Sequence, residues 1–196
     1  MKPITKVMIV VTLALFTDGL LYGLIISLLP YSPAKLSEDW MYEILSASYA
    51  LGVIITTPIS GFFSDRLGRR YSMILGVVIQ AMAILIFANT THFSCLLIAK
   101  LAQGIAASTT WTSGLALITD HFTEKRAQML GYAVLGNTIG LVIGPLLGGF
   151  LFEKFNFQFP FIVAGCFMSV DIFLRAKWVE NIRSNVLVSL RDLYSL

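Results

Sequence analysis

The chain has 196 residues, of which 57% are apolar and only 13% are charged, with a mean hydropathy of +0.80. Soluble domains contain roughly 45–50% apolar and 25% charged residues. This composition excludes a soluble globular domain and a disordered chain, and two cysteines are too few to staple a secreted scaffold. The net charge of +3 does not indicate nucleic-acid binding, because the basic residues are arranged as topology signals. We therefore predict a membrane protein.

Six stretches of low charge are each long enough to cross a bilayer, which takes about 20 apolar residues per helix. We predict an all-α, polytopic fold with spans at about 7–30, 44–63, 71–89, 93–119, 127–152 and 157–174. The first span is too long for the hydrophobic region of a signal peptide, so we expect it to remain in the mature chain. Residues 1–174 then form one transmembrane unit, and residues 175–196 form a cytoplasmic tail.

The basic residues predict the orientation of this integral membrane protein. Eleven of the 14 Lys and Arg residues lie before the first span, in the second and fourth loops or in the tail. Only Lys35 and Lys154 lie in loops on the opposite side. Cytoplasmic loops carry the excess of Lys and Arg, so we expect both termini in the cytoplasm.

Asp18 is a charged residue deep inside the first span. It lies 11 residues into the helix, about 17 Å deep at 1.5 Å per residue, which is close to the midplane. Ionisable groups at this depth mark substrate and proton sites by default. Tyr22, four residues later, shares its helical face. The alternative is a buried carboxylate that a neighbouring helix satisfies.

The fourth span contains a second ionisable residue, Lys100. It lies about two turns from the external side, so its side chain either enters the bundle or extends toward the interface. A stripe of polar, small and aromatic residues continues this face at spacings of three and four: Gln103, Gly104, Ala107, Ser108 and Trp111. Such a stripe either packs helices closely or faces a wet cavity. Asp171 lies near the cytoplasmic end of the sixth span and Arg175 follows four residues later, so we interpret the two as a structural ion pair at the helix end.

The loop between the second and third spans has a specific pattern of glycines and charges: Gly61, Asp65, Arg66, Gly68, Arg69 and Arg70. It resembles the signature loop of the major facilitator superfamily, Gly-x-x-x-Asp-Arg-x-Gly-Arg-Arg/Lys, which lies between the same two helices. From the charges of Asp65, Arg66 and Arg69 we expect a latch that holds the cytoplasmic helix ends in one conformation.

Three further segments agree with this resemblance. In the fifth span a glycine ridge with a proline, made of Gly136, Gly140, Gly144, Pro145, Gly148 and Gly149, is similar to the antiporter motif Gly-x-x-x-Gly-Pro-x-x-Gly-Gly. Lys100, Gln103 and Gly104 resemble the Arg-x-x-Gln-Gly motif, with Lys in place of the usual Arg. The first span resembles that of drug:proton antiporters and vesicular amine transporters, whose aspartate recognises cationic substrates.

The resemblance covers the N-terminal six-helix half of a twelve-helix transporter. It implies proton-coupled antiport of small organic molecules or cations by alternating access, with the lipid bilayer, protons and a second half or second copy as partners. Asp18, Tyr22, Lys100, Gln103 and Trp111 are the predicted substrate and coupling residues. The alternative is a truncated, non-transporting protein that regulates a full transporter. We expect no enzyme, cofactor or metal site, because His92 and His121 fall at opposite faces and Cys95 and Cys166 lie at different depths.

Overall fold

The computed structural model describes residues 3–34, 36 and 38–179. The described residues form six long α-helices, all apolar enough to cross a membrane, and no strand. They are α1 (Pro3–Leu28), α2 (Asp39–Leu67), α3 (Arg69–Asn89), α4 (Phe93–His121), α5 (Arg126–Lys154) and α6 (Phe159–Trp178), with a short 3-10 helix, Leu29–Tyr31, after α1. The prediction of an all-α, multi-pass membrane fold is confirmed. Most of the predicted tail, residues 180–196, lies outside the described part.

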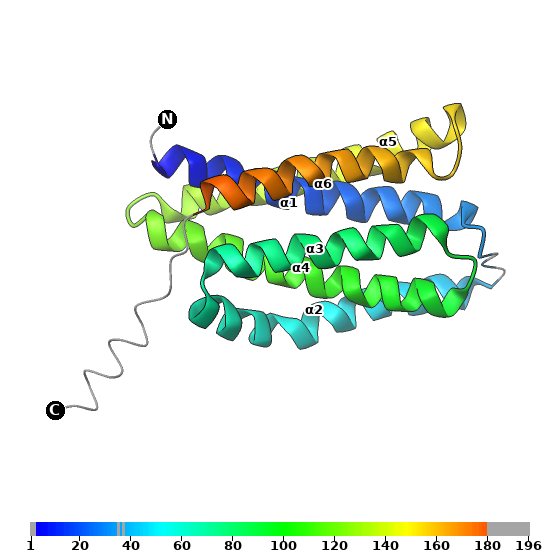
Figure 1. Ribbon diagram of the computed structural model, residues 1–196, viewed down its shortest axis with the longest axis horizontal. Coiled ribbons are helices and arrows are strands. Elements are labelled where there is room, and N and C mark those ends of the chain that lie inside the picture. The colour runs from blue at the N-terminus through cyan, green and yellow to red at the C-terminus, as the bar shows by residue number, and fades with distance from the viewer. Residues whose placement is uncertain (1–2, 35, 37, 180–196) are drawn as a thin grey trace.

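Successive helices run in opposite directions (Figure 1). On one side of the bundle lie α1, α5 and α6, and on the other lie α2, α3 and α4. The most extensive contacts join α1 to α5 and α4 to both α2 and α3. Helix α1 is the most buried, whereas α2 and α5 expose most of their length.

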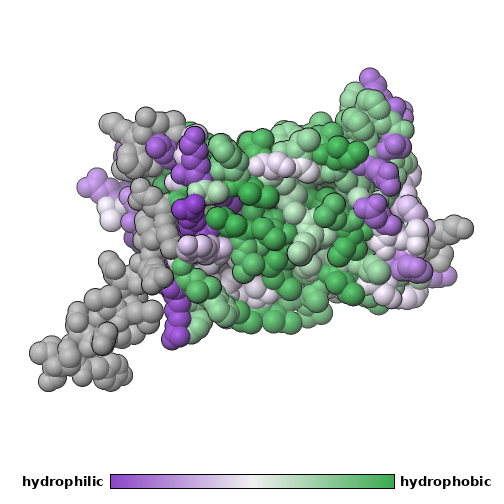
Figure 2. All heavy atoms as spheres, in the orientation of Figure 1, coloured by the Kyte–Doolittle hydropathy of each residue, from purple (hydrophilic) through white to green (hydrophobic). Residues whose placement is uncertain are grey.

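The surface has an apolar belt between two polar ends (Figure 2). Large apolar side chains such as Ile54 on α2 and Leu146 on α5 are each 68% exposed. Helices that cross a bilayer are expected to present such apolar side chains to the lipid. Their backbone polar groups are satisfied within each helix. The start of α1, the α2–α3 turn, the α4–α5 loop and the end of α6 share one end of the bundle (Figure 1). That this end faces the cytoplasm stays a prediction.

The contact between α1 and α5 depends on glycine. A Cβ atom at Gly136, Gly140 or Gly144 would collide with the backbone of α1, and one at Gly148 would crowd Ser27 and Leu24. Small residues at this spacing let two membrane helices approach backbone to backbone. Gly149 is different, because nothing lies within 4 Å of the place that a Cβ atom would take there. The α1 contact therefore uses four glycines of the predicted ridge and leaves Gly149 on another face.

Candidate functional site

A cavity of about 480 Å³ lies between four helices. Its lining residues come from α1 (Asp18, Gly19, Tyr22), α2 (Tyr49, Val53, Thr57), α4 (Ala107, Ser108, Trp111, Thr112, Leu115) and α5 (Asn137, Leu141). Helices α1 and α4 pack against each other, but α2 and α5 do not pack closely on each other in the described part of the chain. The cavity therefore lies against α1 and α4, with α2 and α5 as its side walls.

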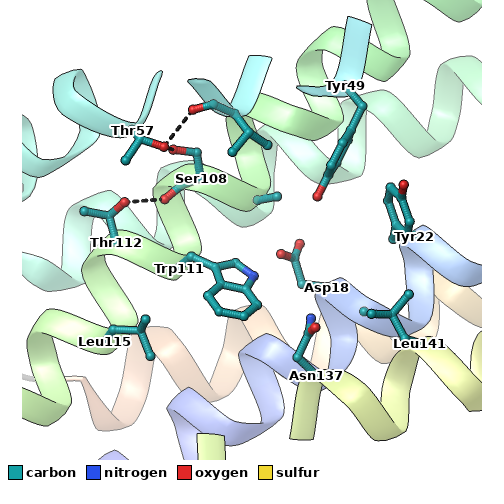
Figure 3. A pocket seen from close by; sticks show the side chains of 13 residues that line it. Asp18, Tyr22, Tyr49, Thr57, Ser108, Trp111, Thr112, Leu115, Asn137 and Leu141 are labelled. Carbon is teal, nitrogen blue, oxygen red and sulfur yellow. Dashed lines mark hydrogen bonds between the residues drawn. The ribbon is translucent and has the colours of Figure 1, made fainter. Parts of the chain in front are cut away.

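Asp18 brings the one carboxylate among the residues that line this cavity in the described part of the chain. Figure 3 shows its carboxylate pointing into the cavity, with the Tyr49 hydroxyl and the Trp111 indole nitrogen on the facing walls. The Tyr22 and Tyr49 rings lie next to each other, with centroids 4.7 Å apart. On the α5 side, Nδ2 of Asn137 donates to the backbone oxygen of Leu15 at 2.9 Å. The result is a half-buried carboxylate surrounded by aromatic and amide groups.

Hydroxyl groups join α2 to α4 along one wall of the cavity. The Oγ1 of Thr57 and the Oγ of Ser108 share a hydrogen bond of 3.0 Å, and Ser60 donates to Thr112 at 3.1 Å. Thr57 and Thr112 also donate to carbonyl groups of their own helices. These bonds satisfy the hydroxyl groups inside the membrane and hold the two helices in register.

Lys100 is buried, with 1% of its surface exposed, so it does not extend to the interface. Its Nζ donates to Oε1 of Gln103 at 3.1 Å. The same ammonium group lies 5.0 Å from the Tyr22 ring centroid, 5.8 Å from that of Tyr49 and 5.6 Å from that of Phe87. Lys100 and Gln103 do not line the cavity, but they lie directly behind its two tyrosines.

Of the predicted coupling residues, the cavity thus brings together Asp18, Tyr22 and Trp111. Sequence reasoning missed Tyr49, Thr57 and Asn137 as lining residues. Two weak signals pointed to them. Tyr49 and Thr57 are two helical turns apart and share one face of α2, and Asn137 interrupts the apolar fifth span with an amide.

The predicted ion pair of α6 is present and fully inside the bundle. Both oxygens of the Asp171 carboxylate accept hydrogen bonds from Arg175, at 2.9 and 2.5 Å. The Nη1 of Arg175 also donates to the backbone oxygen of Met73 on α3 and to Oγ1 of Thr110 on α4. The pair therefore joins three helices behind the cavity.

The signature loop forms a sharp turn between α2 and α3. Gly68 has a φ of 103°, a conformation that favours glycine. Arg69 forms ion pairs with Asp65 and with Asp120 at the end of α4, and it donates to Ser64. Arg70 donates to the backbone oxygen of Ala176 on α6. Arg66 instead lies over the Phe62 ring of its own helix, and a Cβ atom added at Gly61 would make only an ordinary contact with Thr112.

Comparisons with known proteins agree with this architecture. Residues 9–190 match the family model of the Major Facilitator Superfamily. The chain is 33% identical over 175 residues to a probable vesicular acetylcholine transporter-B of Danio rerio, covering 84% of this chain and 36% of that protein. It is 32% identical over 180 residues to an uncharacterized MFS-type transporter, C18.02, of Schizosaccharomyces pombe, covering 87% of this chain and 40% of the relative.

A solved structure shows the same fold. The human organic anion transporter MFSD10 superposes with a TM-score of 0.76 at 20% identity, over 92% of this chain and 49% of the other. The chain thus spans less than half the length of each of these proteins. Together with the matched residues 9–190, the six-helix fold shows that this chain belongs to the Major Facilitator Superfamily of membrane transporters.

Proposed function

We propose that this chain provides the substrate-binding half of a secondary transporter that exchanges protons for small organic cations by alternating access. The observation that supports this most directly is the position of Asp18. Its carboxylate points into a cavity of about 480 Å³ whose walls carry Tyr22, Tyr49 and Trp111. A carboxylate attracts a cation, and aromatic faces add cation-π attraction. The cavity volume falls in the range of small-molecule sites.

The relatives support the choice of substrate class. Some are named as vesicular acetylcholine transporters, and acetylcholine is a quaternary ammonium compound. Rings such as those of Tyr22 and Trp111 suit this chemistry, because a quaternary ammonium group donates no hydrogen bond and is bound by charge and by aromatic faces. An organic cation is therefore the proposed substrate, while the individual compound stays open.

Alternating occupancy of Asp18 would couple the two fluxes. A buried carboxylate is far easier to accommodate when it is protonated or paired than when it is ionised and alone. Binding of a cation would then release the proton from Asp18, and protonation would release the cation. In this scheme the Asp18 carboxylate binds either a proton or the organic cation at every stage of the cycle.

A complete pathway needs a partner surface. The cavity has α2 and α5 as side walls, and both helices expose most of their length. A second six-helix half, related by an axis along the membrane normal, would close it. Both a separate C-terminal half and a parallel second copy of this chain fit that symmetry.

Uptake in proteoliposomes tests the proposal. The full chain is reconstituted, its oligomeric state is measured in nanodiscs, and uptake of a radiolabelled quaternary ammonium compound is followed after a pH jump. Asp18→Asn should abolish proton-driven uptake without loss of folding, and Asp18→Glu should keep partial uptake with a shifted pH dependence. Glu153→Gln, which removes an exposed carboxylate at the end of α5, serves as the control. Normal uptake by Asp18→Asn would overturn the coupling role.

The second candidate function is a non-transporting partner that associates with a full transporter and regulates it. The observation in its favour is the apolar surface of α2 and α5 beside the open cavity, for example Ile54 and Leu146. This candidate predicts no uptake by the chain alone, and a lower uptake by a full-length relative when both are reconstituted together.

A further inference from the structure

A second, much smaller space lies on the inner side of Asp18, away from the cavity. It is bounded by α1, α3, α4 and α6, and polar groups make up most of its lining: Thr17, Asp18, Gln80, Thr110, Asp171 and Arg175. The volume open to the centre of a water molecule is about 10 Å³. That is close to the minimum for holding one water, which also needs two to four polar partners. Size and lining therefore suit a single water molecule.

Two side chains at this space lack hydrogen-bond partners among the described residues. Both amide atoms of Gln80 and the Oγ1 of Thr17 are buried and unpaired. Each of the two residues is only 3% exposed. An unsatisfied buried polar group destabilises a fold by about 1–3 kcal/mol, so native structures nearly always provide a partner. Lipid cannot provide one, because these groups lie inside the bundle.

We propose that this space holds one bound water molecule, which hydrogen-bonds Gln80 and Thr17 and connects the Asp18 carboxyl to the Asp171–Arg175 ion pair. The pair alone leaves the amide of Gln80 unsatisfied, because Arg175 directs its hydrogen bonds to Asp171, Met73 and Thr110. Asp18 borders both spaces, so rotation of its own side chain brings the carboxyl from the cavity to the water.

The water matters because of the groups that surround Asp18. The charged and titratable ones are Tyr22 on its own helix, Tyr49 on α2, and Asp171 and Arg175 on α6, while Lys100 of α4 lies behind the Tyr22 ring. Helices α3 and α5 contribute the uncharged amides of Gln80 and Asn137. On its inner side, Asp18 would exchange a hydrogen bond with this water, while Lys100 directs its own hydrogen bond to Gln103. Gln80 and Thr17 thus become positioning residues for the protonation of Asp18.

Infrared difference spectroscopy of the full chain in nanodiscs tests this inference without any transport. Spectra at acidic and neutral pH are subtracted, in ordinary water and in water labelled with oxygen-18. The expected result is a carboxyl band that is absent in Asp18→Asn, together with a water O–H band that shifts with the label. Gln80→Met, which keeps the size of the side chain, should remove the water band and move the midpoint of the Asp18 titration by at least about half a pH unit.

Two further variants keep the test decisive. Thr17→Val preserves side-chain shape and should weaken or remove the same water band, so it replaces Gln80→Met should that variant not fold. Ser113→Ala is the matched control, because the Oγ of Ser113 is also buried and unpaired among the described residues but does not border this space. It should leave both bands unchanged. A water band that survives both Gln80→Met and Thr17→Val, or that is absent from the parent, overturns the inference.

The presence of the water does not depend on the proposed function. Only its role in the protonation of Asp18 during transport rests on that function. Loss of uptake in Asp18→Asn with no labelled water band would support the coupling role and reject the water site. A labelled water band together with normal uptake in Asp18→Asn would support the water site and reject the coupling role. The two proposals therefore fail separately.

Discussion

Arg69, at the start of α3, lies with its Nε 3.1 Å from Oδ2 of Asp120, at the end of α4. Its guanidinium also binds Asp65 and Ser64 near the end of α2. One side chain thus connects three helix ends at a single face of the membrane. The side chain of Arg69 is 7% exposed, while those of Asp65 and Asp120 are 45% and 30% exposed. The carboxylates can separate from the arginine and find water, which suits a contact that opens and closes.

The first prediction concerns this contact. Asp120→Asn and Asp65→Asn should each raise the population of conformations in which the ends of α2 and α4 separate. The expected shift is up to about fivefold, because partly exposed ion pairs contribute at most about 1 kcal/mol. Substrate affinity should change less. Distances between spin labels at the two helix ends measure the populations. Arg66→Gln is the control, since Arg66 contacts Phe62 of its own helix, and a pure loss of affinity would count against the latch.

The second prediction concerns the glycines of α5. Gly140→Ala places a Cβ against the backbone of Phe16 and Leu20 and should lower the free energy of unfolding by about 1–3 kcal/mol. Gly149→Ala adds the same atom where nothing lies within 4 Å, so it should be neutral or slightly stabilising. Unfolding of both variants in mixed detergent micelles, followed by circular dichroism, gives the comparison. Equal stability of the two variants would contradict the close packing of α1 on α5.

The third prediction concerns Tyr49, which sequence reasoning did not identify. Tyr49→Leu should weaken binding of a quaternary ammonium compound about five- to thirtyfold, because a desolvated cation-π contact contributes roughly 1–2 kcal/mol. Tyr71→Leu is the matched control, because Tyr71 is 59% exposed and does not line the cavity. Equilibrium binding to the reconstituted protein measures both. The same affinity in both variants would remove Tyr49 from the proposed binding site.

The fourth prediction concerns topology. Reporter fusions after Ala34 and after Ser184 should report opposite sides of the membrane, with the second in the cytoplasm. The reason is the distribution of Lys and Arg, most of which lies in the segments at one end of the bundle. If both reporters fall on the same side, the assignment of spans to the two faces is wrong.

The six helices could be predicted from the sequence because hydropathy measures the property that the bilayer selects. Their ends could not be predicted as well. Helix α2 begins at Asp39 rather than near residue 44 and ends at Leu67 rather than near 63. Charged residues limit the apolar span, but a helix continues into the headgroup region, where charges are hydrated. A helix is therefore longer than the apolar span that hydropathy detects within it.

The candidate site was predictable only in part, for a similar reason. The depth of Asp18 follows from its place in the helix, but the faces that meet at the cavity depend on packing between helices. Asn137 and Tyr49 could not be assigned to the cavity without knowing how α5 and α2 pack around α1. Asp120 gave no signal either, since an acidic residue beside a loop is ordinary until Arg69 is seen next to it.

The packing of α1 on α5 restricts how the protein can move. Along this contact Gly136, Gly140, Gly144 and Gly148 follow one another every four residues, while Gly19 and Gly23 of α1 meet the backbone of α5. A slide of α5 along α1 by one or two residues would move larger side chains into the positions of these glycines, where there is room only for the hydrogen atom of a glycine. The next permitted register is four residues away, about 6 Å along the axis. Shear between these two helices is therefore blocked, and they should travel as one rigid unit, leaving changes of shape to the contacts of α2, α3, α4 and α6.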